Sequence, residues 1–251
     1  MSTILITGCS TGFGLETARL FLDRGWRVIA TMRNPDDCSL SRHENLTVLA
    51  LDVTDPASIS AAVAAAGPID VLVNNAGIGW LNAHEGTTDE MIRRLFTTNT
   101  FGTMAMCRAV LPAIRERGAG TIINVTSSVT LKPLALLSAY SASKAATASF
   151  TASLAQEVAP FGVRVLEVLP GQSSATAFSA NARERIEQEG GFPAAYAEMM
   201  EQVFAQFAAL PADSGTQPSD VAEAVWRAAT DPACPVRLPA GADAVQWFAD
   251  A

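Results

Sequence analysis

The sequence predicts a single doubly wound α/β domain over residues 1–251, with one parallel sheet of about seven strands flanked by helices. The first observation is that short apolar segments rich in β-branched residues recur along the chain, each bounded by Gly, Pro, Asp or Asn. They are apolar on both faces, as strands buried on both sides of a parallel sheet are. The second is that helical segments separate them, and this alternation is typical of a doubly wound sheet.

The elements follow from this pattern in order. We expect strands at residues 3–7, 27–31, 46–52, 69–75, 120–127, 163–170 and, weakly, 235–239. We expect helices at residues 13–24, 56–66, 88–116, 139–160 and 218–230. Residues 172–216 depart from the alternation, because they form a long insert after the sixth strand, first polar and then amphipathic. A long insert at the carboxyl edge of such a sheet often covers a ligand, so we expect a helical substrate lid there.

Composition argues against several classes of protein. Apolar residues make up 49% of the chain and charged residues 17%, which suits a large core and not a disordered chain. The net charge of −8 repels phosphate backbones, so we expect no nucleic-acid partner. No apolar run is long enough to cross a bilayer, and the chain opens directly on a strand, so we expect a cytoplasmic protein without a membrane partner. Neither a disulfide framework nor a metal site is expected, because the four cysteines lie far apart: Cys9, Cys38, Cys107 and Cys234.

A glycine cluster, "TGCSTGFG", follows the first strand and leads into a helix. Glycines let the backbone turn sharply and approach a pyrophosphate, and the helix N-terminus supplies N–H donors. This context predicts a dinucleotide site, made by Gly8, Ser10, Thr11, Gly12, Phe13 and Gly14.

Tyr140 and Lys144 lie four residues apart within "SAYSASKAATASF", in a chain that has only two tyrosines and two lysines. Residues at i and i+4 share one helix face. A nearby ammonium favours the phenolate and lowers the pKa of a phenol. The pair is therefore predicted to act as a tuned proton donor and acceptor near neutral pH.

These motifs resemble those of the short-chain dehydrogenase/reductase family over nearly the whole chain. The resemblance is carried by the glycine cluster at residues 7–14, "LDV" at 51–53, "NNAG" at 74–77, Asn99, Ser127, the Tyr140–Lys144 pair and "PG" at 170–171. The N-terminal third most resembles the retinol and 17β-hydroxysteroid dehydrogenase branch. The family implies a Rossmann-type fold and a homodimer or homotetramer, with helices 88–116 and 139–160 at the interface.

The resemblance also implies roles at the reacting end of the site. Ser127 would hydrogen-bond the substrate carbonyl, and strand alternation favours it over Thr126 and Ser128. Lys144 would hold the nicotinamide ribose as well as tune Tyr140. Asn99, an unusual residue inside a helix, would hold a water that links the lysine to solvent, or would stabilise a kink.

For the cofactor, the resemblance places Asp52 at the adenine amino group and Val53 against the ring. It places Asn75, Ala76 and Gly77 along the adenosine ribose, although the asparagine also suits a simple strand-end turn. The nicotinamide carboxamide would meet the loop that contains Pro170, Gly171 and Ser173. That loop departs from the family pattern, with Ser173 at a usually apolar position and Ala175 where Thr is common, followed by Thr176.

The choice of dinucleotide depends on the end of the second strand. An NAD enzyme of this fold places an acid there, whereas this chain has Thr31 and then Arg33. A guanidinium binds a 2′-phosphate through charge-assisted hydrogen bonds, and Thr11 adds a hydroxyl. We therefore favour NADP(H) over NAD(H). An ordinary solvated loop residue is the alternative for Arg33.

Together these features predict an NADP(H)-dependent oxidoreductase that acts on a ketone, aldehyde or secondary alcohol with apolar flanks. The alternatives are a cofactor-binding sensor without turnover and an epimerase or dehydratase of the same fold. Several large side chains of the insert suit core packing or an apolar substrate pocket: Phe178, Tyr196, Met199, Met200, Phe204 and Phe207.

Overall fold

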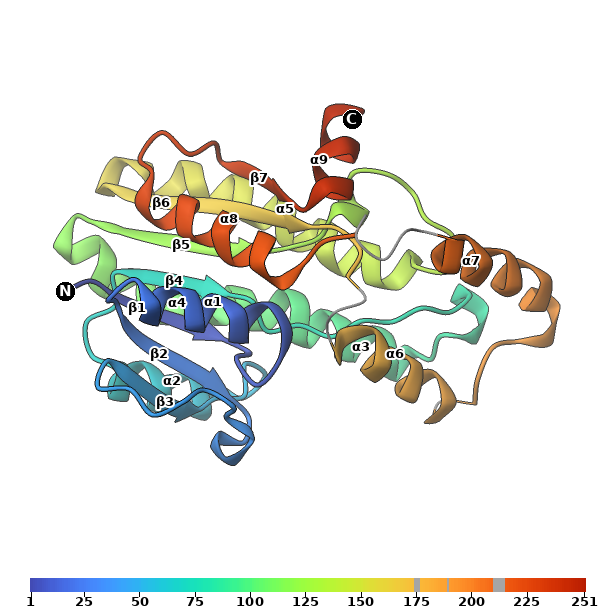
Figure 1. The fold of residues 1–251 in the computed structure, drawn as a ribbon, viewed down its shortest axis with the longest axis horizontal. Coiled ribbons are helices and arrows are strands. Elements are labelled where there is room, and N and C mark those ends of the chain that lie inside the picture. Colours follow the sequence, from blue (N-terminus) through green and yellow to red (C-terminus); the bar gives the residue numbers. More distant parts are fainter. Residues whose placement is uncertain (174–176, 189, 210–214) are drawn as a thin grey trace.

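The protein, described by a computed structural model, contains a seven-stranded parallel sheet with helices on both faces (Figure 1). The structure describes residues 1–173, 177–188, 190–209 and 215–251. The strand order is β3-β2-β1-β4-β5-β6-β7, which confirms the predicted doubly wound class. The strands are β1 (Thr3–Thr7), β2 (Arg27–Met32), β3 (Leu46–Ala50), β4 (Val71–Asn74), β5 (Gly120–Val125), β6 (Val163–Pro170) and β7 (Arg237–Ala240).

Two layers of helices bury the two faces of the sheet. On one face α1 (Gly12–Asp23) and α8 (Pro218–Thr230) pack side by side, and Phe21 meets Trp226 with ring centroids 5.1 Å apart. The other face is covered by α2 (Pro56–Ala66), α4 (Thr103–Arg117) and α5 (Ser138–Val158). These apolar side chains supply most of the driving force for the sandwich, about 25 cal/mol per Å² of buried apolar surface.

The structure divides residues 88–116, which were predicted to form one helix, into three elements. The helix α3 (Asp89–Phe96) begins where the Thr88 hydroxyl accepts the Met91 N–H at 3.1 Å. A π-helical turn follows at Thr97–Gly102, and then α4 begins. Asn99 lies inside this turn, and π-helical turns are frequent at functional sites. The helix is therefore irregular at Asn99, while the kink expected there stays a prediction.

The insert after β6 forms two helices, α6 (Ala177–Gln188) and α7 (Ala197–Ala209), which lie beyond the carboxyl ends of the strands (Figure 1). The helix α6 packs against α3 there, since Ile186 shares a buried cluster with Met91 and Leu95. Ala175 and Thr176 lie outside the described residues, as do the side chains of Phe178 and Phe207. The sequence missed the short C-terminal helix α9 (Ala242–Ala249). No helix of the described residues is long and apolar enough to span a bilayer.

Candidate active site

A cleft of about 1330 Å³ lies at the carboxyl ends of the strands. Among the predicted site residues, Gly14 and Asn99 do not line it. The others do: Gly8, Ser10, Thr11, Gly12, Phe13, Arg33, Asp52, Val53, Asn75, Ala76, Gly77, Ser127, Tyr140, Lys144, Pro170, Gly171 and Ser173. Residues spread from position 8 to position 173 thus converge on one space, because all strands of a parallel sheet end on the same edge.

The glycine loop is held open by backbone geometry. Gly8 and Gly12 adopt φ values of 75° and 63°, which favour glycine. Gly14 lies behind the loop, where an added Cβ would stand 2.3 Å from the carbonyl oxygen of Gly8. Thr11 precedes α1 without making a side-chain capping bond, so the first N–H groups of the helix face the cleft uncapped. This arrangement fits a pyrophosphate at the helix N-terminus.

Asn75 fixes the same loop from the neighbouring strand. Its Nδ2 donates to the carbonyl oxygens of Thr7 at 2.9 Å and Gly8 at 3.0 Å. Its own N–H and that of Ala76 donate to the Thr7 hydroxyl, each at 3.0 Å. The amide of Asn75 therefore joins β4 to the glycine loop, and its contact with the ribose stays a prediction.

At the far end of the cleft, Arg33 lies next to Asp52. The Asp52 carboxylate accepts the hydroxyl of Thr54 at 2.7 Å and its N–H at 2.9 Å. The Thr54 hydroxyl and, more weakly, the Arg33 guanidinium hold the pKa of Asp52 below its usual value. No ion pair of Arg33 occurs among the residues that the structure describes.

The prediction about Thr31 needs correction. Its side chain is fully buried and donates to the carbonyl oxygen of Ile6 at 3.0 Å, so it does not face the cleft. The residues of this strand end that line the cleft are Met32 and Arg33. Met32 is the last residue of β2 and Arg33 follows it, so both lie at the carboxyl edge of the sheet, whereas Thr31 lies within the strand. The cleft still meets no acid at the end of β2.

The hydroxyls of Ser127 and Tyr140 form a hydrogen bond inside the cleft. Ser127 follows β5, and its side chain hydrogen-bonds Tyr140 of α5. The Val129 N–H donates to Ser127 Oγ at 3.3 Å, and Thr130 donates to its carbonyl oxygen at 2.9 Å. Lys144, one turn after Tyr140, donates from Nζ to the carbonyl oxygen of Val125 at 3.0 Å. Serine, tyrosine and lysine therefore occupy one corner of the cleft.

The expected lowering of the Tyr140 pKa is wrong for the protein without a ligand. Burial raises the pKa of Tyr140 to about 12, and the hydrogen bond from Ser127 only partly opposes this. Burial also lowers the pKa of Lys144 to about 8, while the Glu167 carboxylate acts to raise it. Desolvation of both side chains therefore outweighs the attraction between ammonium and phenolate.

Asn99 supports this corner from behind. It is 1% exposed, its Oδ1 accepts the Ile78 N–H at 2.8 Å, and its Nδ2 donates to the Ile78 carbonyl oxygen at 3.0 Å. Nδ2 also donates to Ser143 Oγ at 3.0 Å. The side chain thus joins α5 to the segment after β4, while the water relay stays a prediction. Gly77 leaves room for it, since a Cβ there would stand 3.2 Å from Asn99 Oδ1.

Comparison with known proteins agrees with this geometry. The sequence model of the short chain dehydrogenase family matches residues 2–187. The uncharacterized oxidoreductase YusZ of Bacillus subtilis is 35% identical over 237 residues, which are 90% of this chain and 84% of that protein. This chain belongs to the short-chain dehydrogenase family. Membership makes it an oxidoreductase of Rossmann type.

Two solved structures of short-chain dehydrogenases are similar to this one. The enzyme from Streptomyces avermitilis has 34% identity and a TM-score of 0.84, covering 100% of this chain and 92% of that one. The enzyme from Burkholderia cenocepacia, in complex with NADP, has 28% identity and a TM-score of 0.80, covering 99% and 91%. Similar structures also include complexes with NADPH and with NADH. The resemblance to the retinol and 17β-hydroxysteroid branch stays a prediction.

In this short-chain dehydrogenase, residues that the sequence analysis missed hold the loop after β6. The Gly171 N–H donates to Thr216 Oγ1 at 2.8 Å, and the Gln172 N–H donates to Asp243 Oδ2 at 2.6 Å. A Cβ on Gly171 would stand 2.1 Å from Asp243 Oδ2, so only glycine fits. Nothing in the local sequence of α9 marks Asp243, because its partner lies 71 residues earlier.

Beyond Tyr140 the short-chain dehydrogenase has an apolar end to its cleft. Trp80, Met91 and Leu95 pack with Tyr140 in one buried cluster. The apolar lining near this end is Trp80, Leu81, Val129, Leu134, Leu137, Ile186, Phe192, Phe204 and Trp247. Among the insert side chains proposed from sequence, Phe204 lines the cleft, whereas Tyr196 donates to Glu85 at the surface and Met199 is 42% exposed.

The polar groups that line the cleft indicate which kind of ligand it can hold. No group of three or more His, Cys, Asp or Glu side chains that could hold a metal ion occurs in the described part of the chain. The donors that line it include hydroxyls, the Lys144 ammonium and the guanidinium of Arg33. That set suits a phosphate-bearing organic cofactor and an oxygen atom that changes its protonation.

Proposed function

We propose that this chain is an NADP(H)-dependent oxidoreductase that interconverts a carbonyl group and an alcohol on an apolar ketone, aldehyde or secondary alcohol. The observation that carries the proposal is the contact between the Ser127 and Tyr140 hydroxyls, one helical turn from Lys144, in the cleft that the glycine loop opens. Acid/base, orienting and phosphate-binding groups share one space there, as a hydride-transfer enzyme requires.

Two of these side chains act on the reacting oxygen atom. Ser127 donates to the carbonyl oxygen and fixes its position. Tyr140 gives that oxygen a proton during reduction and takes the proton back during oxidation. With a pKa near 12 the phenol is protonated at neutral pH, so it is ready to donate. When bound, NADP(H) supplies or accepts the hydride at the carbonyl carbon, so hydride and proton together balance the reaction.

Groups along the rest of the cleft would hold the cofactor. The uncapped N-terminus of α1 faces the pyrophosphate position. Asp52 and Val53 would lie at the adenine and Lys144 would hold the nicotinamide ribose; all three side chains line the cleft. Arg33 would bind the 2′-phosphate, a preference supported by its free guanidinium among the described ion pairs and by the lack of an acid on β2 facing the cleft.

The apolar end of the cleft supports a substrate with apolar flanks around its carbonyl group.

We also propose a cytoplasmic homodimer or homotetramer that uses α4 and α5. An apolar groove of about 500 Å³ on the outer faces of these helices supports it, lined by Leu111, Phe150 and Leu154 among others. Light scattering at micromolar concentration tests the assembly, and a monomer would contradict it.

The experiment is a carbonyl and alcohol panel run with NADPH and with NADH, followed at 340 nm. The expected result is oxidation of NADPH with at least one apolar carbonyl compound, and slower oxidation of NADH. Binding of NADPH without any absorbance change would favour the sensor alternative. Conversion of a substrate without net use of cofactor would favour an epimerase or dehydratase.

A further inference from the structure

A row of polar side chains crosses four neighbouring strands just below the cleft. The register pairs Asn74 of β4 with Asn124 of β5, Asn124 with Glu167 of β6, and Glu167 with Arg237 of β7. Asn74 Nδ2 donates to Asn124 Oδ1 at 2.8 Å, and Asn124 Nδ2 donates to Thr151 Oγ1 of α5 at 2.9 Å. The row therefore faces α5, the helix that carries Tyr140 and Lys144.

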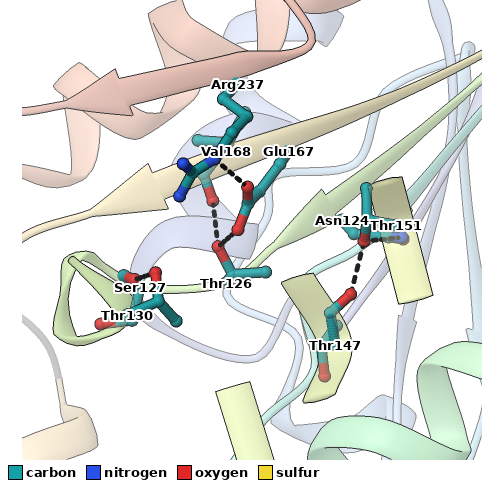
Figure 2. Close-up of polar contacts among 9 residues, drawn as sticks. All are labelled: Asn124, Thr126, Ser127, Thr130, Thr147, Thr151, Glu167, Val168 and Arg237. Atoms are coloured by element: carbon teal, nitrogen blue, oxygen red, sulfur yellow. Dashed lines mark hydrogen bonds and ion pairs between the residues drawn. The ribbon is translucent and has the colours of Figure 1, made fainter. Parts of the chain in front are cut away.

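Glu167 is the charged member buried inside this row. The residue is 2% exposed, and Figure 2 shows its carboxylate between two donors. The Thr126 hydroxyl donates to Oε1 at 2.6 Å, and Arg237 Nε donates to Oε2 at 2.8 Å. The Arg237 side chain is 44% exposed, so one end of the ion pair reaches solvent while the other lies under the cleft. A buried carboxylate is costly, which makes its presence on a core strand informative.

The Glu167 contacts lead directly to the end of β5. Thr126 precedes Ser127, and the Thr126 N–H donates to the Val168 carbonyl oxygen at 2.9 Å. On its other side is Val125, whose carbonyl oxygen accepts the Lys144 ammonium at 3.0 Å. The segment that Glu167 anchors through Thr126 thus presents both the serine and the acceptor for the lysine.

Glu167 is also the charge that acts on Lys144. The elements around Lys144 otherwise present neutral groups: Tyr140 on α5, Asn99 on the π-helical turn, and Thr126 and Ser127 after β5. From β7, Arg237 meets the far oxygen of Glu167. Among the described residues, the carboxylate of Glu167 is therefore the charge that acts on the Lys144 ammonium.

We propose that Glu167 is a positioning residue of this active site: it anchors the Ser127 segment through Thr126 and supplies the carboxylate that faces Lys144 of α5 from the sheet. The proposal rests on the proposed function only for the roles of Ser127 and Lys144. Arg237 serves as the outer partner that holds the Glu167 carboxylate in place without acting on Lys144 itself.

The test titrates Lys144 directly. Because the chain has only two lysines, Lys132 and Lys144, protein labelled with [ε-¹³C]lysine gives two side-chain signals, and Lys132→Arg assigns them. In the wild-type protein without ligand we expect the Lys144 signal to titrate near pH 8. In Glu167→Gln the charged form loses its carboxylate neighbour, so the midpoint should fall by about one pH unit.

Arg237→Gln is the matched control, since it breaks the same ion pair and leaves the Glu167 charge. Both variants should lower Tm, but only Glu167→Gln should lower the Lys144 midpoint. The alkaline limb of kcat/KM should move with that midpoint. An unchanged midpoint in Glu167→Gln, or an equal fall in both variants, would assign Glu167 to the β6–β7 ion pair alone and overturn the proposal.

Two further arrangements keep the test decisive. If Glu167→Gln does not fold, Glu167→Asp keeps the charge and withdraws it from Thr126 by one methylene. Its Lys144 midpoint should lie below that of the wild type, and a midpoint equal to wild type with kcat also unchanged would reject the proposal. Because the NMR titration needs no substrate, a wild-type protein without turnover rejects the proposed function, whereas an unmoved Lys144 signal rejects only the role of Glu167.

Discussion

The two ends of the cleft are held by different kinds of interaction. At the glycine end the structure depends on missing side chains, since Gly8 and Gly12 adopt positive φ and Gly14 leaves no room for a Cβ. At the reacting end it depends on side chains that bond one another, such as Asn99 with Ser143 and Glu167 with Thr126. The glycine end is therefore disturbed by an added side-chain atom, whereas the reacting end is disturbed when a hydrogen-bonding side chain loses its partner.

This difference predicts that substitutions at the two ends of the cleft impair different properties of the enzyme. Substitutions at the glycine end should impair cofactor binding first, because they move the surface that meets the phosphates. Substitutions at the reacting end should leave cofactor binding and change turnover or its pH dependence. The following predictions test that division, beginning with the largest expected effect.

Tyr140→Phe should reduce turnover by about 10²- to 10⁴-fold, the range that general acid catalysis contributes. Tyr140 is 7% exposed, and Ser127 keeps the hydrogen bond from the Val129 N–H when the phenol hydroxyl is removed, so the fold should persist. Stopped-flow or steady-state assays measure the turnover, and NADPH fluorescence measures the binding. Turnover within a few-fold of wild type would remove Tyr140 from the chemistry.

Gly14→Ala should weaken NADPH binding strongly, because its Cβ would stand 2.3 Å from the Gly8 carbonyl oxygen and 2.5 Å from Asn75 Nδ2. Overpacking of this kind costs about 1–3 kcal/mol and displaces the loop. Gly25→Ala is the control, since Gly25 has open space around it, and its positive φ of 76° makes an alanine there costly to stability alone. The control should lose stability and keep its NADPH affinity. Equal NADPH affinity in both variants would contradict the account.

Arg33→Gln should weaken NADPH binding by about 10- to 100-fold and leave NADH binding unchanged, since a hydrogen bond to a charged group contributes about 1.5–3 kcal/mol. Arg19→Gln is the control, because Arg19 is an exposed arginine of α1 paired with Glu16 and does not line the cleft. Isothermal titration with both dinucleotides measures the ratio. An equal loss for NADPH and NADH would place Arg33 away from the 2′-phosphate.

Lys144 should give the protein without ligand a pH-dependent stability. Its folded pKa is about 8, whereas an exposed lysine has a pKa of 10.5, so the unfolded chain binds the extra proton between these values. Stability should therefore rise with pH across this window, and the cost of burying the ammonium is fully present below about pH 8. Relative to Lys144→Met, the wild type should gain about 2 kcal/mol between pH 7.5 and 10, measured by urea unfolding. Parallel curves for the two proteins would show that Lys144 is not desolvated.

The glycine end was largely predictable from sequence. A backbone constraint appears in the sequence as glycine at fixed spacing, and the strand before and helix after it identify the dinucleotide loop. The Tyr140–Lys144 pair was equally visible, because one helix face carries both side chains. The fold class followed from the strand and helix pattern for the same local reason.

The supporting contacts were not predictable from sequence. Asp243 and Thr216 hold the loop after β6 from positions far along the chain, and Glu167 reaches Thr126 across the sheet. The direction of the Tyr140 pKa was also wrong, because the motif reveals the neighbouring ammonium but not the depth of burial. Both failures concern tertiary packing, which local pattern does not encode.

The central claim is that a hydride and a proton reach the same carbonyl group in this cleft. The most direct test incubates the enzyme with NADPH deuterated at nicotinamide C4 and a panel of apolar ketones and aldehydes, and analyses the alcohols by mass spectrometry. The account predicts one deuterium at the carbinol carbon of the product. Protein that binds NADPH but yields no deuterated alcohol with either C4 label, over the whole panel, would contradict it.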